Sequence, residues 1–174
     1  MKIYIMLLGV FLFTACGYKP SSHAIKEVFT DTIYVDVTVD TVEPENAPFI
    51  KDEMNRLVYT RMNARVTSKE EAQSSIYVNY KGTTYRPLAY EDGYVTRYRV
   101  DTRINFVMYT KQGVVKKRIR SRVESDIQAS SLTSSALRTE AIRQGLAKSL
   151  DEFIAYVSAK GIKISKKNRE HTAQ

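Results

Sequence analysis

The sequence predicts an α+β fold, a four-stranded sheet with two helices packed on one face, in the order β-α-β-β-β-α. Four segments alternate apolar and polar residues with a period of two, which is typical of strands with one buried face. Two further segments repeat apolar residues at the helical period. Because each strand has one apolar face and each helix one apolar stripe, both helices should cover the same side of the sheet. The other side is then left open to solvent or to a partner.

The first strand and the first helix follow each other closely. Thr32–Asp40 alternates cleanly, and its apolar face consists of Ile33, Val35, Val37 and Val39. Pro48, after a run of helix-breaking residues, suits the first turn of a helix, with Asn46 or Ala47 as its cap. The helical stripe consists of Ile50, Met54, Leu57, Val58 and Arg61. This helix is expected to end near residues 62–64.

Three antiparallel strands should follow. Ser75–Lys81 alternates, Gly82–Gly93 is expected to be a loop or a frayed strand end, and Tyr94–Tyr109 is the longest strand. A hairpin turn at Thr110–Gly113 leads into the last strand, Val114–Glu124. The side chains expected to face the helices are Ile76, Val78, Tyr80, Tyr94, Tyr98, Val100, Ile104, Phe106, Met108, Val115, Ile119 and Val123.

A long helix should close the domain. After a polar connection over residues 126–132, Thr133 or Ser134 can cap a helix that runs to about Lys160, where Gly161 is expected to end it. Its apolar face consists of Leu137, Ala141, Leu146, Leu150, Phe153, Ile154 and Val157. The remaining residues, 162–174, are basic and polar, and we expect them to be disordered.

The N-terminus has the pattern of a secretory signal peptide. One positive charge, Lys2, precedes an eleven-residue apolar run from Ile3 to Phe13, and small residues lead to a cleavage site. A membrane-spanning helix needs about 20 apolar residues, so this run is too short to be one. The predicted organisation is a signal peptide over 1–15, a tether over 16–31, one domain over 32–161 and a basic tail over 162–174.

Cys16 indicates what kind of signal this is. The run Phe13-Thr14-Ala15-Cys16 resembles the bacterial lipobox, in which the thiol receives a diacylglyceryl group and the new N-terminus is acylated. Cys16 is the only cysteine of the chain, so no disulfide is expected. An ordinary signal peptide that ends near a buried thiol is the alternative. Gly17 stands where Asp would resemble the inner-membrane retention signal, so we expect an outer-membrane lipoprotein on the periplasmic side.

The charge of the chain favours polyanionic partners. There are 27 Lys and Arg residues against 19 Asp and Glu residues, and cleavage after residue 15 would leave 159 residues with a net charge of about +7. Phosphorylated glycolipids, acidic lipid headgroups and nucleic acids all suit such a charge. Export removes most of the case for nucleic acid.

The sequence offers little for catalysis. His23 lies in the expected tether and His171 in the expected tail, where neither would be held rigidly. None of the common metal-binding, phosphate-binding or nucleophile motifs occurs. We therefore expect a non-enzymatic protein with no metal and no cofactor other than the covalent lipid on Cys16.

A cluster of cations on two neighbouring strands is the candidate ligand site. Alternation places all of them on the side away from the helices, interrupted only by Asp101 and Glu124. The cluster consists of Arg97, Arg99, Arg103, Lys116, Arg118, Arg120 and Arg122. Like charges opposed across a sheet are destabilising unless an anion compensates them, and Arg binds phosphate with a bidentate fork. The alternative is that exposed strands carry Lys and Arg to deter aggregation.

The mature chain resembles the LptE family of lipopolysaccharide-assembly lipoproteins. The resemblance is carried by Cys16-Gly17-Tyr18, by the order of elements, and by the run Ser125-Asp126-Ile127-Gln128-Ala129-Ser130-Ser131-Leu132-Thr133-Ser134-Ser135-Ala136-Leu137-Arg138-Thr139-Glu140-Ala141-Ile142. It implies a plug inside the outer-membrane β-barrel LptD that helps the barrel assemble and binds lipopolysaccharide. The family's ligand-contacting residues have no clear counterparts here, since residues 90–93 are acidic and residues 126–135 lack Lys and Arg.

Two other functions fit the same sequence. One is a periplasm-facing lipoprotein chaperone that carries acyl chains between helices and sheet, which requires an incompletely filled core. The other is an exported surface-attachment module.

Overall fold

The computed structural model describes residues 21–39, 44–126 and 134–172. Their elements are α2 (Ser21–Lys26), β1 (Thr32–Val39), α3 (Asn46–Thr60), β2 (Arg65–Val66), β3 (Ser74–Glu91), β4 (Tyr94–Thr110), β5 (Gly113–Asp126) and α4 (Ser134–Thr172). The strands form one sheet in the order β2-β1-β3-β4-β5. The fold is therefore α+β, as predicted.

The sheet has five strands where the sequence predicted four. The additional strand, β2, is only two residues long and pairs in parallel with the start of β1. Two residues are too few to show an alternating pattern, which is why this strand was missed. β1 also pairs in parallel with β3, and α3 forms the crossover between them. β3, β4 and β5 are antiparallel neighbours joined by short turns.

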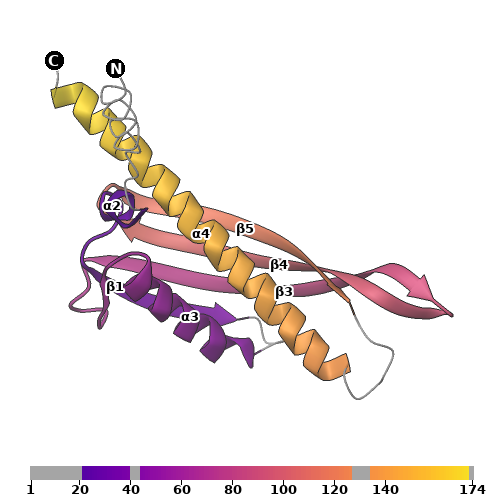
Figure 1. Cartoon of the computed structure of the whole chain (residues 1–174). Coiled ribbons are helices and arrows are strands. Elements are labelled where there is room, and N and C mark those ends of the chain that lie inside the picture. Colours follow the sequence, from indigo (N-terminus) through magenta and orange to yellow (C-terminus); the bar gives the residue numbers. More distant parts are fainter. Residues whose placement is uncertain (1–20, 40–43, 127–133, 173–174) are drawn as a thin grey trace, which may run out of the picture.

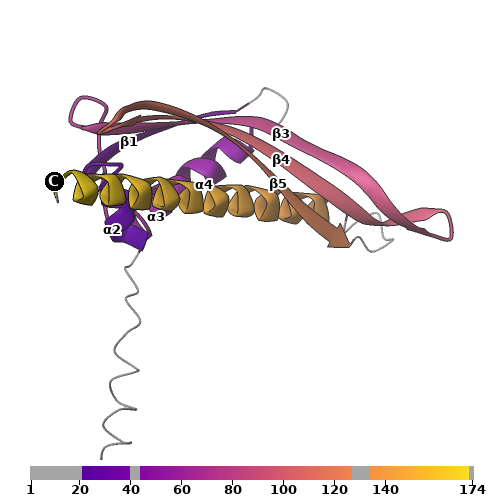
Figure 2. The ribbon, with the colours of Figure 1, turned by 90° about the horizontal axis from the view of Figure 1, so that it is seen from above.

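The helices cover one face of the sheet, as predicted. α3 packs against β1, and α4 crosses β4 and β5 diagonally, while none of the described helices lies on the opposite face (Figures 1 and 2). The core between the layers is largely apolar, with a few buried hydroxyl groups such as those of Ser121 and Ser149, which are hydrogen-bonded to each other. Phe106 of β4 stacks on Phe153 of α4 with ring centroids 4.2 Å apart. Ile33, Ile76 and Ile104 are fully buried beneath the helices.

β3 is longer than the sequence indicated. Residues 82–91 were expected to be a loop or a frayed end, but they continue the strand and pair with β4 in an arm that extends beyond the helices. β5 pairs with β4 as far as Arg97, so only the tip of this arm is two-stranded. Register shifts between Tyr80 and Thr83 and around Pro87 absorb the irregular residues, and Gly82 adopts a φ of 92°. Tyr94 was expected to be buried but is exposed, because it lies near the end of this arm.

The expected tether is folded over the part that the structure describes. Ser21–Lys26 forms a short helix, and the residues after it enter the core. Ile25, Val28 and Phe29 are fully or almost fully buried. These apolar residues are few and are interrupted by polar ones, so they gave no periodic pattern in the sequence.

α4 does not end at Gly161, and residues 162–172 are helical instead of disordered. Gly161 has a packing role, because a β-carbon there would overlap the carbonyl oxygen of Ala24 in α2 and lie 3.2 Å from its Cα. The glycine therefore permits a close approach between two helices instead of capping one. A second glycine, Gly145, lies against β4, where an added β-carbon would be 3.3 Å from the Cβ of Thr102.

Candidate anion-binding surface

All seven cations of the predicted cluster project from the helix-free face of the sheet. The β4–β5 register sets Arg99 opposite Glu124, Arg103 opposite Arg120, and Asn105 opposite Arg118. Directly opposed residues project to the same side of an antiparallel pair, and alternate residues along each strand share that side. The register thus brings the cluster together on one surface, but the structure divides it into two halves.

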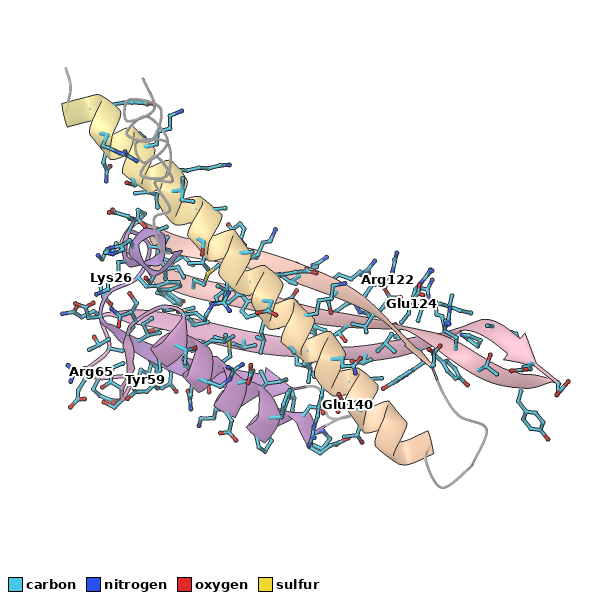
Figure 3. All side chains as sticks on the ribbon, viewed as in Figure 1. Lys26, Tyr59, Arg65, Arg122, Glu124 and Glu140 are labelled. Carbon is cyan, nitrogen blue, oxygen red and sulfur yellow. The ribbon has the colours of Figure 1, made fainter. Side chains whose placement is uncertain are left out.

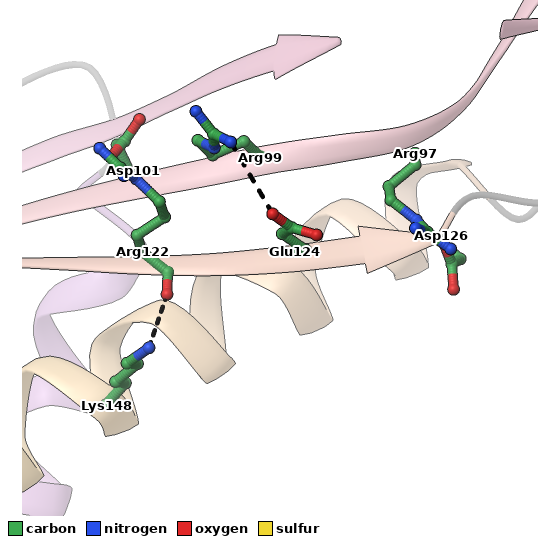
Figure 4. Close-up of polar contacts among 7 residues, drawn as sticks. All are labelled: Arg97, Arg99, Asp101, Arg122, Glu124, Asp126 and Lys148. Carbon is green, nitrogen blue, oxygen red and sulfur yellow. Dashed lines mark hydrogen bonds and ion pairs between the residues drawn. The ribbon is translucent and has the colours of Figure 1, made fainter. Parts of the chain in front are cut away.

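The first half is a ladder of cross-strand ion pairs. Arg97 donates to Asp126 over 2.6 Å, and Arg99 lies 3.8 Å from Glu124 (Figure 4). The hydrogen bond that Arg97 donates to Asp126, and then the negative charge of Asp126, raise the pKa of Arg97 above its ordinary value. These pairs compensate the charge of the strands at this end.

The third pair of the ladder is partly buried. Arg122 donates to Asp101 over 3.3 Å, and Asp101 is only 7% exposed although it faces away from the helices. Arg122 and Glu124 project from β5 in Figure 3, and the carbonyl of Arg122 accepts a 2.8 Å hydrogen bond from Lys148 of α4. Asp126 was not counted as part of this surface at the level of sequence, because it was assigned to the connection after the last strand.

The second half is a group of four cations without acidic partners. We call Arg103, Lys116, Arg118 and Arg120 the cationic quartet. Arg103 lies directly opposite Arg120, so two like charges face each other across the strands. Arg118 donates to Asn105 over 3.3 Å, and Lys116 lies opposite Val107. Among the residues that the structure describes, none of the four forms an ion pair with a carboxylate.

An aromatic patch borders the quartet on the same face. Tyr34, Tyr77 and Tyr109 come from β1, β3 and β4, and the ring of Tyr77 contacts the other two edge to face, with centroids 6.0 Å from Tyr34 and 5.7 Å from Tyr109. Tyr77 lies opposite Val107, the residue that also faces Lys116, and Tyr109 is 49% exposed. The alternation of β1 and β3 is enough to place Tyr34 and Tyr77 on this face. Tyr109 was missed, since its position at the end of a long strand gave no sign of its partners.

This surface can hold an extended amphiphilic anion. Guanidinium groups bind phosphate oxygens in pairs, and tyrosine rings give flat contact to sugars or acyl chains. Elsewhere in the described residues, no group of three or more His, Cys, Asp or Glu side chains could hold a metal ion. His23 and His171 are both exposed. No described helix is long and apolar enough to span a membrane.

Comparison with protein families decides the classification. The model of the LptE family, described as lipopolysaccharide-assembly, matches residues 34–153. The chain belongs to the LptE family. The match begins in β1 and ends in α4, so it covers most of the sheet, the crossover helix and the first half of the helix that packs on β4 and β5.

Solved structures show the same fold at low identity. Lipoprotein B from Nitrosomonas europaea aligns with a TM-score of 0.51 and 16% identity, covering 74% of this chain and 83% of that chain. A lipoprotein from Caulobacter crescentus aligns with a TM-score of 0.50 and 9% identity, covering 81% of this chain and 94% of that chain. A search of curated proteins gave no match. These structures therefore share the fold of this chain although few residues are identical.

Proposed function

We propose that this LptE-family protein is the outer-membrane lipoprotein subunit of the lipopolysaccharide export translocon. In this role it plugs an LptD-like β-barrel, helps the barrel assemble and binds lipopolysaccharide. The family match over residues 34–153 carries the proposal. The helix-free face of the sheet adds chemical support, because it combines cations that lack carboxylate partners with tyrosine rings that are exposed or half-buried.

The cationic quartet is the proposed contact for the phosphates of lipopolysaccharide. Arg103 and Arg120 lie directly opposite each other, so one phosphate between them would relieve their mutual repulsion and accept hydrogen bonds from both. The aromatic patch of Tyr34, Tyr77 and Tyr109 would lie under the neighbouring sugar or acyl chain. The ladder of ion pairs is less suited to an anion, since its cations already have carboxylate partners.

The anchor and the location follow from Cys16, which lies outside the described residues. We propose that Cys16 carries the lipid and holds the protein at the periplasmic side of the outer membrane. Three acyl chains would make the attachment near-permanent, since each buried CH₂ contributes about 0.8 kcal/mol. In the proposed role the protein binds its partners and catalyses no reaction. It requires no cofactor besides the lipid and binds no nucleic acid.

An acyl-chain carrier is less well supported. Such a carrier needs space between the helices and the sheet. The described core is instead filled by large side chains, including Phe29, Tyr80, Phe106 and Phe153, and two of these rings stack directly. No feature of the described residues favours a surface-attachment module.

Lipopolysaccharide binding by the quartet can be tested with the variant Arg103→Gln/Arg120→Gln. We expect its affinity for lipopolysaccharide to fall about tenfold, equivalent to about 1.4 kcal/mol, as two charge-assisted contacts are lost. Its thermal stability should be unchanged or slightly higher, because a like-charged pair has been removed. Binding measured over a series of salt concentrations should also show a weaker salt dependence.

The matched control is Lys51→Gln/Lys69→Gln, which removes the same charge from exposed positions outside β3, β4 and β5. It should bind as the parent does. An equal loss in both double variants would show that only net charge matters. Unchanged binding in the quartet variant would show that this surface is not the lipopolysaccharide site.

A further inference from the structure

The last part of α4 carries a dense group of cations that the proposed ligand surface does not use. From Lys160 onward the helix contains five cations and one acid, Glu170, which gives a net charge of +4. The five cations are Lys160, Lys163, Lys166, Lys167 and Arg169. All but Lys160 are exposed, and among the described residues none forms an ion pair with a carboxylate.

These cations have a defined arrangement on the helix. Lys160, Lys163 and Lys167 lie on one stripe at helical spacing, and Ile162 is followed by Lys166 and Arg169 on the adjacent stripe. Ile162 is 58% exposed, an apolar side chain next to Lys163 in the sequence and one turn before Lys166. Like charges three or four residues apart destabilise a helix by about 0.2–0.5 kcal/mol per pair, so this segment loses stability by holding them together.

The helix dipole does not account for the cluster. Cations favour the C-terminal end of a helix only within its last turn. That turn contains Arg169 and His171, whereas the four lysines precede it.

The position of the segment relative to the N-terminus suggests its partner. α4 crosses β5 and its end projects beyond the edge of the sheet (Figure 1). Where it leaves the sheet, Lys117 of β5 lies 4.7 Å from the ring of Tyr156, and Gly161 packs directly on Ala24 of α2. The cationic segment therefore begins at the point where α2 is fixed.

Cys16 is close to this point along the chain. It precedes Ser21, the first residue of α2, by five residues, and five residues span at most about 18 Å. A lipid on Cys16 would thus keep α2 within about 18 Å of the membrane surface. Residues 162–172, of which Ile164 still packs against the core, have a helical length of about 16 Å, which is of the same order.

We infer that the C-terminal end of α4 is a second membrane contact, which binds the acidic phospholipid surface of the leaflet that holds the lipid anchor. The lysines meet the headgroup phosphates and Ile162 enters the headgroup region, as in other basic amphipathic segments. The anchor alone gives attachment but permits rotation about a single point. The added contact fixes the orientation of the sheet relative to the membrane. This inference rests on the proposed lipid anchor at Cys16.

The test uses the mature chain, residues 16–174, with Cys16→Ser so that no lipid contributes to binding. Partition onto vesicles of phosphatidylethanolamine and phosphatidylglycerol is compared with partition onto vesicles of phosphatidylethanolamine and phosphatidylcholine. We expect binding to the acidic vesicles only, decreasing as salt is raised. The variant Lys163→Gln/Lys166→Gln/Lys167→Gln should lower the partition coefficient about tenfold or more, as each cation near an acidic surface strengthens binding about fivefold.

The control variant Lys51→Gln/Lys81→Gln/Arg86→Gln removes three exposed charges from α3 and β3 and should bind as the parent does. Equal binding to both vesicle types, or equal partition of the two triple variants, would overturn the inference. So would a lysine variant that binds vesicles normally but no longer co-purifies with a barrel, since the segment would then contact protein. The vesicle assay contains neither a barrel nor an acyl chain on Cys16. A negative result in the vesicle assay therefore does not contradict the proposed role in lipopolysaccharide export. Conversely, the vesicle assay still tests the membrane contact if that role proves wrong.

Discussion

Gly161 shows how one residue can be interpreted in two ways. A glycine after a long helical pattern usually marks the end of the helix, because it adopts a left-handed conformation easily. Here it lies inside α4, and the absence of a side chain lets the backbone of α2 come into contact. The two roles look identical in a sequence without the neighbouring helix.

The variant Gly161→Ala distinguishes them. In an ordinary helix interior this change stabilises a protein by about 1 kcal/mol. We expect it to destabilise this protein by about 1–3 kcal/mol instead, because the new methyl group overlaps the carbonyl of Ala24. Urea denaturation followed by circular dichroism measures the change. The exposed-side variant Lys163→Ala should have little effect, and a stabilised Gly161→Ala protein would contradict the close contact.

The charged residues of the open face were predictable as a set but not as pairs. Strand alternation was sufficient to place all seven cations on one side. The division into a ladder and a quartet depends on the register of β4 and β5, which sets Asp101 opposite Arg122 but Arg103 opposite Arg120. Alternation alone does not give this register, which follows from the hairpin turn at Thr110–Gly113, since β4 and β5 pair from there without a register shift.

At the scale of elements, predictability followed the strength of the periodic signal. The central strands and the start of α4 near Ser134 were predicted correctly, because the periodic patterns of these strands and of this helix extend over many residues. β2 and α2 were missed because they are short. The second half of β3 was missed because Gly82 and Pro87 suggested a loop, although the bulges accommodate both residues.

α2 and the residues after it belong to the folded domain, although the sequence predicted a tether there. Phe29 is 1% exposed and lies in the same core cluster as the sheet residues. We expect Phe29→Ala to reduce the free energy of unfolding by about 3–5 kcal/mol, as for other large aromatic side chains removed from a core. His23→Ala, at an exposed position of the same helix, is the control and should change it little. If Phe29→Ala unfolded at the same urea concentration as the parent, the segment would be a tether after all.

At the scale of the whole molecule, the fold separates two tasks. Helices cover one face of the sheet and supply its core, while the other face presents cations and tyrosines. The end of α4 beside α2 adds a third surface, at the end of the molecule where the proposed anchor joins the domain. A protein of this design has a complete core without a partner on its open face, and that face is available for recognition.

The central claim is that this LptE-family protein functions as the partner of an outer-membrane barrel in lipopolysaccharide export. The most direct measurement is purification of the tagged protein from detergent-solubilised outer membranes, followed by identification of what accompanies it. The proposed function predicts a barrel of the LptD type in a near one-to-one ratio. A tagged protein that is well folded, present in the outer membrane and recovered without any barrel would contradict it.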